Sequence, residues 1–408
     1  MKSLKKIAAA LLLLMLVPLG GAAPAQAASA SCLPILMYHD VTRSGEYGNL
    51  AISPRSFEEH MKWLAENGFT PLLPSELVLI AEGELPMPVR PVMITLDDGY
   101  AANYTEAYPI LRRNGMRAVI SVVSGMVVNS HYDPSWAMTW NELREMSESG
   151  LVEIGSHTFY LHGDKPGSHG AERLPDESEA EYLERVGGDI SRSCELIERE
   201  LGRPCLFFAY PFGISTDEAE NYIREQGLHR ITVTTQTRLA DIADGLYRLP
   251  RIRVGEHEHV RTRPGIREIA ARTVTAETSV ITVSAGGRVR EAPAYEINGV
   301  NYVRLRDAAY LLMGSGRSFS VGWDGDTRRV LLDTGKSYAP TGKELRRPDR
   351  AGSFAVEPRS VWTDIDGESR LLTAFNIGGE NYFSLRWLGH YLGFSVRWDD
   401  VARTMYVE

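Results

Sequence analysis

Short apolar runs alternate with amphipathic stretches from Leu33 to about Val254. This alternation is typical of βα units, which assemble into a parallel sheet covered by helices. The spacing of apolar residues and the capping residues predict three helices clearly. One is expected over residues 57–65 with Ser56 as its cap, one between Thr139 and Gly150, and a long charged one over about 176–201.

Four of the apolar runs end in residue types that take part in catalysis. In α/β barrels and open parallel sheets the site lies at the carboxyl ends of the strands, so these endings are expected to meet at one mouth. We therefore predict an α/β domain over residues 33–268. The runs are Leu33–Tyr38 before His39, Pro91–Leu96 before Asp97-Asp98-Gly99, Val152–Ser156 before His157, and Leu206–Tyr210 before Pro211-Phe212-Gly213.

The pattern changes after about Ile269, where Thr-, Val- and Gly-rich alternation replaces the βα rhythm. An internal repeat lies in this region, because residues 297–306 are echoed 80 positions later by residues 377–386. Each copy reads as strand, turn, strand, helix, strand, turn, strand. We expect residues 275–408 to form a small α+β domain with two internal repeats.

The first 27 residues have the features of a secretory signal peptide. Three lysines precede an apolar run over residues 7–19, and small residues follow up to Ala27. The run is shorter than the ~20 apolar residues of a transmembrane helix. We therefore expect cleavage after Ala27, a secreted, extracellular protein and no later transmembrane span. A lipoprotein anchored at Cys32 is a weaker alternative, because no large apolar residue directly precedes it.

Charge and cysteine content narrow the class of partner. The formal net charge is -9, and loss of the three N-terminal lysines makes it more negative. An acidic exported protein is a poor binder of nucleic acid by bulk charge and suits a neutral glycan better. The three cysteines, Cys32, Cys194 and Cys205, do not make a disulfide framework. A bridge between Cys194 and Cys205 and two separate buried thiols are both open.

Two adjacent aspartates, Asp97 and Asp98, end an apolar strand, where their charge is costly unless it is used. Neighbouring strand residues point to opposite sides, so one carboxylate can face a metal while the other faces a water. Gly99 permits a tight backbone turn. On this motif alone, a helix-capping pair is an equally good interpretation.

The histidines change that balance. His157 follows a predicted strand and His162 lies five residues later, a spacing that can close a loop around an ion. With one aspartate they make three protein ligands and an open position, as in hydrolytic zinc sites. Other divalent metals also suit such ligands. His169, His257 and His259 are weaker candidates, since they lie in polar loops without a matching carboxylate.

These residues resemble the motifs of the polysaccharide deacetylases, the NodB-homology domain of carbohydrate esterase family four. Thr95 to Gly99 resembles their first motif, and Ser156 to His162 their metal-binding second motif. The resemblance covers roughly Leu33 to Val254 and implies a deformed (β/α) barrel. By position it implies Asp97 as the general base.

The same resemblance implies Asp98, His157 and His162 as the zinc ligands. Tyr210-Pro211-Phe212-Gly213 is similar to the family's third motif. There the family's chemistry implies that the oxyanion formed from an N-acetyl carbonyl is held by zinc and by the backbone N–H of Phe212, with Pro211 and Tyr210 beside it. Release of the amine then needs an acid.

Two departures from the common pattern point to one branch of the family. The histidine gap is five rather than four, and Ala209 stands where most members have an arginine. Both departures resemble the exported poly-N-acetylglucosamine deacetylases, which also begin with a Met-Tyr-His-Asp-Val-like segment. That branch implies His39 as the catalytic acid, a buried supporting histidine being the alternative. The partner of Asp97 is open, with Arg251 or Arg253 as candidates.

The C-terminal repeats resemble the small stalk-like domain at the N-terminus of some copper amine oxidases. No copper chemistry is expected, because His390 is the only histidine of the region. Tyr302 and Trp323 recur as Tyr382 and Trp398, which favours core packing over sugar stacking. Attachment to the cell wall is a hypothesis for this domain.

Three functions follow from these patterns. The leading one is a secreted, zinc-dependent N-deacetylase acting on a polysaccharide of N-acetylglucosamine, either exopolysaccharide or peptidoglycan. The second is an O-acetyl esterase of xylan or another glycan, which needs the same metal and base but less help from an acid. The third is a catalytically inactive cell-wall-binding protein, which would be expected to have lost a ligand or the base.

Overall fold

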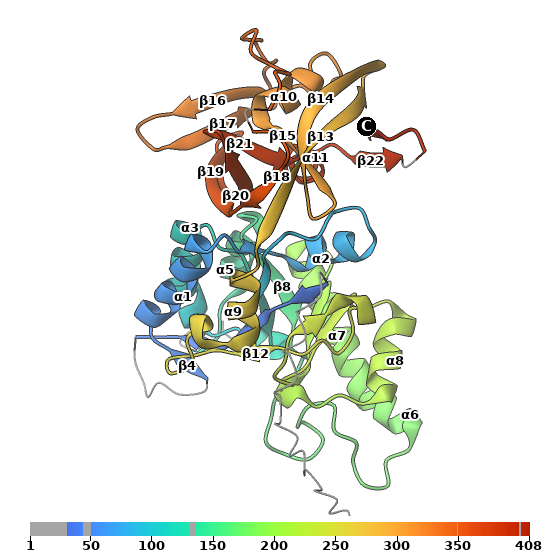
Figure 1. Ribbon diagram of the computed structural model, residues 1–408. Coiled ribbons are helices and arrows are strands. Elements are labelled where there is room, and N and C mark those ends of the chain that lie inside the picture. Colours follow the sequence, from blue (N-terminus) through green and yellow to red (C-terminus); the bar gives the residue numbers. More distant parts are fainter. Residues whose placement is uncertain (1–30, 44–49, 130–135, 349, 400) are drawn as a thin grey trace, which may run out of the picture.

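The structure is a computed structural model that describes residues 31–43, 50–129, 136–348, 350–399 and 401–408. The predicted signal peptide lies outside the described residues. Among those described, no helix has the length and apolar character that a membrane crossing requires. Two large sheets with their helices make up most of this part of the chain (Figure 1).

The first sheet is parallel throughout and has eight strands in the order β10-β9-β8-β7-β6-β2-β12, with β5 beside the start of β6. It curls without closing, which confirms the predicted deformed (β/α) barrel (Figure 1). The strands are β2 (Ile35–Tyr38), β5 (Thr70–Pro71), β6 (Pro91–Leu96), β7 (Ala118–Val122), β8 (Val152–Ser156), β9 (Phe207–Ala209), β10 (Ile231–Val233) and β12 (Ile252–Arg253). Two small pairs accompany it, β1 (Cys32–Leu33) with β11 (Ala240–Asp241) and β3 (Asp40–Val41) with β4 (Ala51–Ile52).

Helices follow most of these strands, as the βα rhythm predicts. Strand β6 is buried along its whole length, and its apolar side chains belong to a core shared with the first helices of the chain. Burial of each large apolar side chain contributes roughly 1.5–3 kcal/mol to folding. The helices are α1 (Pro54–Glu66), α2 (Pro74–Ala81), α3 (Tyr108–Asn114), α4 (Ser124–Asn129), α5 (Trp140–Glu148), α6 (Glu179–Tyr182), α7 (Gly188–Leu201), α8 (Asp217–Gln226) and α9 (Pro264–Ala270).

The helix boundaries agree with the sequence predictions in part. Helix α5 has the predicted capping box of Thr139 and Glu142. Helix α1 begins earlier than predicted, because Ser53 is its cap and the side chain of Ser53 accepts a hydrogen bond from the backbone of Ser56. The long charged helix is present as α6, a π-helical turn and α7, ending at Gly202.

The second sheet has the order β16-β17-β19-β20-β21-β15-β14-β13-β23-β22, with β18 beside β13. Each repeat has the predicted order of elements. The first copy is β14 (Arg288–Ile297), β15 (Val300–Arg304), α10 (Leu305–Leu311), β16 (Ser320–Asp324) and β17 (Arg329–Asp333); the second is β20 (Glu368–Ile377), β21 (Glu380–Ser384), α11 (Leu385–Leu392), β22 (Val396–Asp399) and β23 (Thr404–Val407). The remaining strands are β13 (Val274–Ala285), β18 (Ser353–Val356) and β19 (Pro358–Ile365).

The repeated aromatic residues do not all pack in the core as predicted. Tyr302 and Tyr382 are both buried in one apolar cluster. Trp323 is 58% exposed, so its assignment to the core was wrong. It lies on β16, the edge strand of the sheet.

The second sheet docks on the first at the end where the parallel strands begin (Figure 1). Thr70 opens β5, and its hydroxyl lies 2.6 Å from that of Thr373. Arg90 directly precedes β6, and its guanidinium lies 2.7 Å from the Glu357 carboxylate. The predicted catalytic residues follow the opposite ends of the strands, so the docked domain leaves that end uncovered.

A buried charged network lies at this contact. Glu76 of α2 is 1% exposed and pairs with both terminal nitrogens of Arg117, at 2.6 and 2.8 Å. From the C-terminal domain, the Tyr391 hydroxyl donates to Glu76 at 3.3 Å, and the His390 ring nitrogen lies at the same distance. Burial raises the pKa of Glu76, but the charge of Arg117 and the hydrogen bonds of Arg117 and His390 together outweigh burial and lower this pKa to about 2.

Glu76→Gln is expected to lower the free energy of unfolding by roughly 3–5 kcal/mol at pH 7, because Arg117 loses its buried counter-charge. The pKa of Glu76 is depressed in the folded state, so the carboxylate stabilises the fold above its unfolded pKa of about 4.3 and loses this effect as pH falls towards 2. Denaturant unfolding of both proteins at pH 7 and pH 3 would show the difference shrinking. Glu84→Gln, at an exposed position, is the matched control, and an equal loss there would contradict the prediction.

Candidate active site

Asp98, His157 and His162 come together after β6 and β8. The Nε2 atoms of His157 and His162 lie 3.3 and 3.1 Å from Asp98 Oδ1. The three possible ligand atoms lie within 4.8 Å of one another. Asp98 and His157 are buried, whereas the side chain of His162 is 25% exposed, so the cluster is reachable from one side.

The tautomer of His157 follows from its second nitrogen. Nδ1 lies 2.7 Å from the carbonyl oxygen of Ala209, at the end of β9. A carbonyl only accepts, so Nδ1 carries the hydrogen and Nε2 presents a lone pair towards Asp98. Two acceptors this close repel each other unless a cation lies between them. The donor set therefore fits a metal ion, with one side left for substrate.

Asp97 is buried beside this cluster and pairs with Arg251. The two guanidinium nitrogens lie 2.8 and 2.6 Å from the two carboxylate oxygens, and the Ser121 hydroxyl lies 3.3 Å from Oδ1. Burial raises the pKa of Asp97, but the charge and hydrogen bond of Arg251, together with the neighbouring His157 and His39, outweigh burial, and the pKa is lowered. Asp97 is therefore an ionised carboxylate at neutral pH.

The side chain of Arg251 is fully buried, and hydrogen bonds to neighbouring residues hold its guanidinium in place. Its Nε donates to the carbonyl of Thr234 at 2.9 Å, and one terminal nitrogen donates to the Thr95 hydroxyl at 3.0 Å. Of the two arginines considered from the sequence, the structure places Arg251 against Asp97. Arg253 instead has its backbone carbonyl bonded by the side chain of Arg263.

His39 follows β2 and lies among the charged groups of the cluster. Burial lowers its pKa, and the nearby carboxylates of Asp97 and Asp98 only partly offset this effect. Its Nδ1 is buried and has no hydrogen-bond partner in the described part of the chain. His39 is therefore neutral at pH 7, with one ring nitrogen uncommitted.

The third motif approaches the cluster through Phe212. The Phe212 ring is 40% exposed and stacks on the rings of His162 and His169, with centroids 4.7 and 4.2 Å apart. Tyr210 is buried, and its hydroxyl donates to Glu220 at 3.1 Å. Pro211 is also buried.

Three residues of this region have left-handed backbones although they are not glycine. Their φ values are 76° for Asp98, 74° for Thr158 and 60° for Phe212. Such conformations cost roughly 1–3 kcal/mol each and persist where the surroundings enforce them, commonly at functional sites. The sequence pointed to backbone freedom only at Gly99.

Among known proteins, similarity is found to deacetylases of polysaccharides. Residues 84–231 match the family described as polysaccharide deacetylase. The Bacillus subtilis protein YxkH, whose name assigns it provisionally to these deacetylases, is 32% identical over 222 residues, 54% of this chain and 71% of YxkH. The chain belongs to the polysaccharide deacetylase family. The predicted family resemblance is thereby confirmed, whereas that of the C-terminal repeats stays a prediction.

Two further similarities have lower sequence identity. The poly-beta-1,6-N-acetyl-D-glucosamine N-deacetylase of Escherichia coli K12 is 26% identical over 251 residues, 56% of this chain, and the chain spans only 36% of that protein. The solved structure of IcaB from Ammonifex degensii is 26% identical, with a TM-score of 0.48, and covers 59% of this chain and 96% of its own.

This deacetylase has site residues that the sequence did not single out. Asp40 has a buried oxygen without a partner in the described chain, and burial together with the Asp98 charge raises its pKa to about 6. Burial and the nearby Asp98 charge raise the pKa of Tyr100, and its ring centroid lies 5.1 Å from that of Trp136. Asp40 directly follows His39 in the sequence, and this position was the one signal that could have indicated Asp40 as a site residue.

Two of the weaker histidine candidates, His169 and His259, are not among the three clustered ligands of the described residues. His169 is at the mouth, where its ring stacks on Phe212, but it is not among the three clustered ligands. The ring centroids of His259 and His60 lie 4.3 Å apart, and Nδ1 of His60 lies 2.9 Å from the Tyr38 hydroxyl. These contacts are those of packed side chains and not of metal ligands.

Proposed function

We propose that this protein is an exported, zinc-dependent N-deacetylase of a polysaccharide of N-acetylglucosamine. The observation that carries the proposal is the cluster of Asp98, His157 and His162 beside a buried, ion-paired Asp97. The names of relatives, which specify N-deacetylation of a glucosamine polymer, support the choice of substrate. An inactive binding protein is disfavoured because all four residues are present and adjacent.

Asp98, His157 and His162 would hold the ion. A divalent metal bound there supplies a Lewis acid that polarises the acetyl carbonyl and makes a water more acidic. Zinc suits two imidazoles, one carboxylate and an open position, and the fixed tautomer of His157 directs its lone pair to the ion.

Asp97 accepts the proton of the attacking water. Arg251 holds it ionised and fixes both of its oxygens, so the base needs no reorientation. The backbone N–H of Phe212 donates to the developing oxyanion, and the exposed Phe212 ring gives the sugar an apolar face.

His39 delivers a proton to the leaving amine. It is neutral at rest, so it must first accept a proton; the proton that Asp97 takes from the water supplies it, and the uncommitted ring nitrogen permits this. An ester releases a better leaving group than an amide does. The contribution of His39 is therefore larger for N-acetyl than for O-acetyl substrates.

The test is acetate release by the full chain from β-1,6-linked N-acetylglucosamine oligomers, peptidoglycan and acetylxylan. Release from the glucosamine oligomers is expected to be the fastest, to stop after chelation and to return with zinc. Activity that survives complete removal of metal would contradict the metal role, and faster release from acetylxylan would favour the esterase.

His39→Ala separates the acid from the rest of this site. It is expected to lower amide hydrolysis by ~10²–10⁴-fold and ester hydrolysis much less. His60→Ala is the matched control, because His60 is a buried histidine of the neighbouring helix α1. Equal losses on both substrates would remove the acid assignment.

A further inference from the structure

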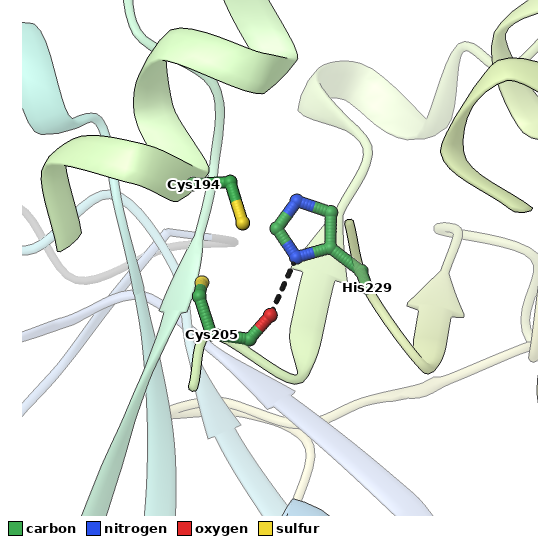
Figure 2. A group of neighbouring side chains, drawn as sticks. All are labelled: Cys194, Cys205 and His229. Atoms are coloured by element: carbon green, nitrogen blue, oxygen red, sulfur yellow. Dashed lines mark hydrogen bonds between the residues drawn. The ribbon is translucent and has the colours of Figure 1, made fainter. Parts of the chain in front are cut away.

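A second group of potential ligands lies away from the catalytic cluster. Cys194 belongs to α7, Cys205 precedes β9, and His229 precedes β10 (Figure 2). The two sulfurs and a ring nitrogen lie within 4.8 Å of one another. The three residues are 3%, 1% and 1% exposed, so they form a closed group inside the fold.

His229 is held in one orientation and one tautomer. Its Nδ1 donates to the carbonyl of Cys205 at 2.7 Å, and its ring stacks on Phe208 with centroids 5.2 Å apart. Figure 2 shows both sulfurs on the side of the ring that carries its nitrogens. Burial lowers the pKa of His229 to about 4, so the imidazole is neutral, the form that binds metals.

Nε2 of His229 is the unexplained atom of the group. It is buried and has no hydrogen-bond partner in the described part of the chain. A buried acceptor without a partner costs roughly 1–3 kcal/mol. A disulfide between the cysteines would use both sulfurs and leave Nε2 as it is, whereas a metal ion would use all three groups.

We propose that Cys194, Cys205 and His229 form a second metal site, which takes a thiophilic divalent ion of the zinc class. Three atoms no more than 4.8 Å apart can all lie within about 2.8 Å of a common point, so a small contraction reaches the usual Zn–S and Zn–N lengths of about 2.0–2.3 Å. Two thiolates, a neutral imidazole and a divalent ion have no net charge, which suits a buried position better than a monovalent ion does. The carbonyl oxygen of Leu228, 3.3 Å from the Cys194 sulfur, is an available fourth donor.

The position of this site gives it a structural role. It joins the helix α7 to the starts of β9 and β10, which are neighbours in the sheet. Strand β9 ends at Ala209, whose carbonyl fixes the tautomer of the catalytic His157. An ion at the start of β9 would therefore clamp the strand that orients a ligand at its other end.

The test uses cobalt as a probe, because thiolate ligands give an intense sulfur-to-cobalt absorption in the near ultraviolet and the catalytic cluster contains no sulfur. Co²⁺ is added to the full chain after chelation and reduction. One equivalent of this absorption is expected, and it should persist in His162→Ala. It should disappear in Cys205→Ser and in His229→Ala, while Cys32→Ser, the matched control, retains it.

Folding and oxidation are checked alongside. Circular dichroism establishes that the variants are folded, and zinc should raise the melting temperature of the wild type and of Cys32→Ser more than that of Cys205→Ser. A folded, reduced wild type without the absorption would overturn the proposal. So would a chain purified without reductant in which mass spectrometry finds Cys194 bonded to Cys205.

Discussion

Asp97→Asn is expected to lower kcat for acetate release by ~10²–10⁴-fold, with metal content and KM little changed. The amide has the shape of the carboxylate but cannot accept the proton of the attacking water. The carboxylate of Asp97 lies directly against Arg251 and not among the three clustered ligands, so the ligand set is intact in the variant. Steady-state kinetics and metal analysis on the same preparations measure both quantities.

The substitution has a second effect that must be separated from the first. Arg251 keeps its charge but loses its counter-charge, so the fold is weakened as well. The double variant Asp97→Asn with Arg251→Met removes both charges and is the control for stability. An Asp97→Asn enzyme with full activity would show that another group accepts the proton.

Arg251→Met is expected to cost roughly 3–5 kcal/mol of unfolding free energy at pH 7, because Asp97 then remains as a buried carboxylate without a partner. Adding Asp97→Asn to it should recover much of this loss, although activity stays low. Denaturant unfolding of the two single variants and the double variant gives the interaction between the residues.

The same variant has a kinetic signature that a purely structural arginine would not give. Arg251 lowers the pKa of Asp97. Without it, burial raises this pKa, so the base becomes protonated at a higher pH. The acidic limb of the activity profile should therefore move to higher pH in Arg251→Met. An unmoved limb in a folded variant would contradict the ion pair as the means of holding Asp97 ionised.

Strand endings were the part of the site that the sequence could predict. Apolar runs end just before Asp97, His157 and the segment of Phe212. Parallel pairing then brings these carboxyl ends together at one end of the sheet. The prediction works because strand direction, which the βα rhythm determines, fixes where the next polar residue must lie.

Partners from distant elements could not be predicted with the same certainty. Arg251 and Asp97 are 154 positions apart, and nothing in either segment's pattern pairs them. The left-handed backbone of Asp98 and Phe212 is likewise imposed by the surroundings. The exposure of Trp323 was missed because recurrence in two copies was taken as a sign of packing, whereas its strand lies at a sheet edge.

The docking of the C-terminal sheet on the starting ends of the parallel strands has an evolutionary consequence. Thr70, Arg90 and Arg117 supply that contact at the starts of β5, β6 and β7, and the far end of β6 leads into Asp97 and Asp98. Substitutions at the docking end of the parallel sheet therefore need not change the residues at the end that carries the proposed catalytic groups.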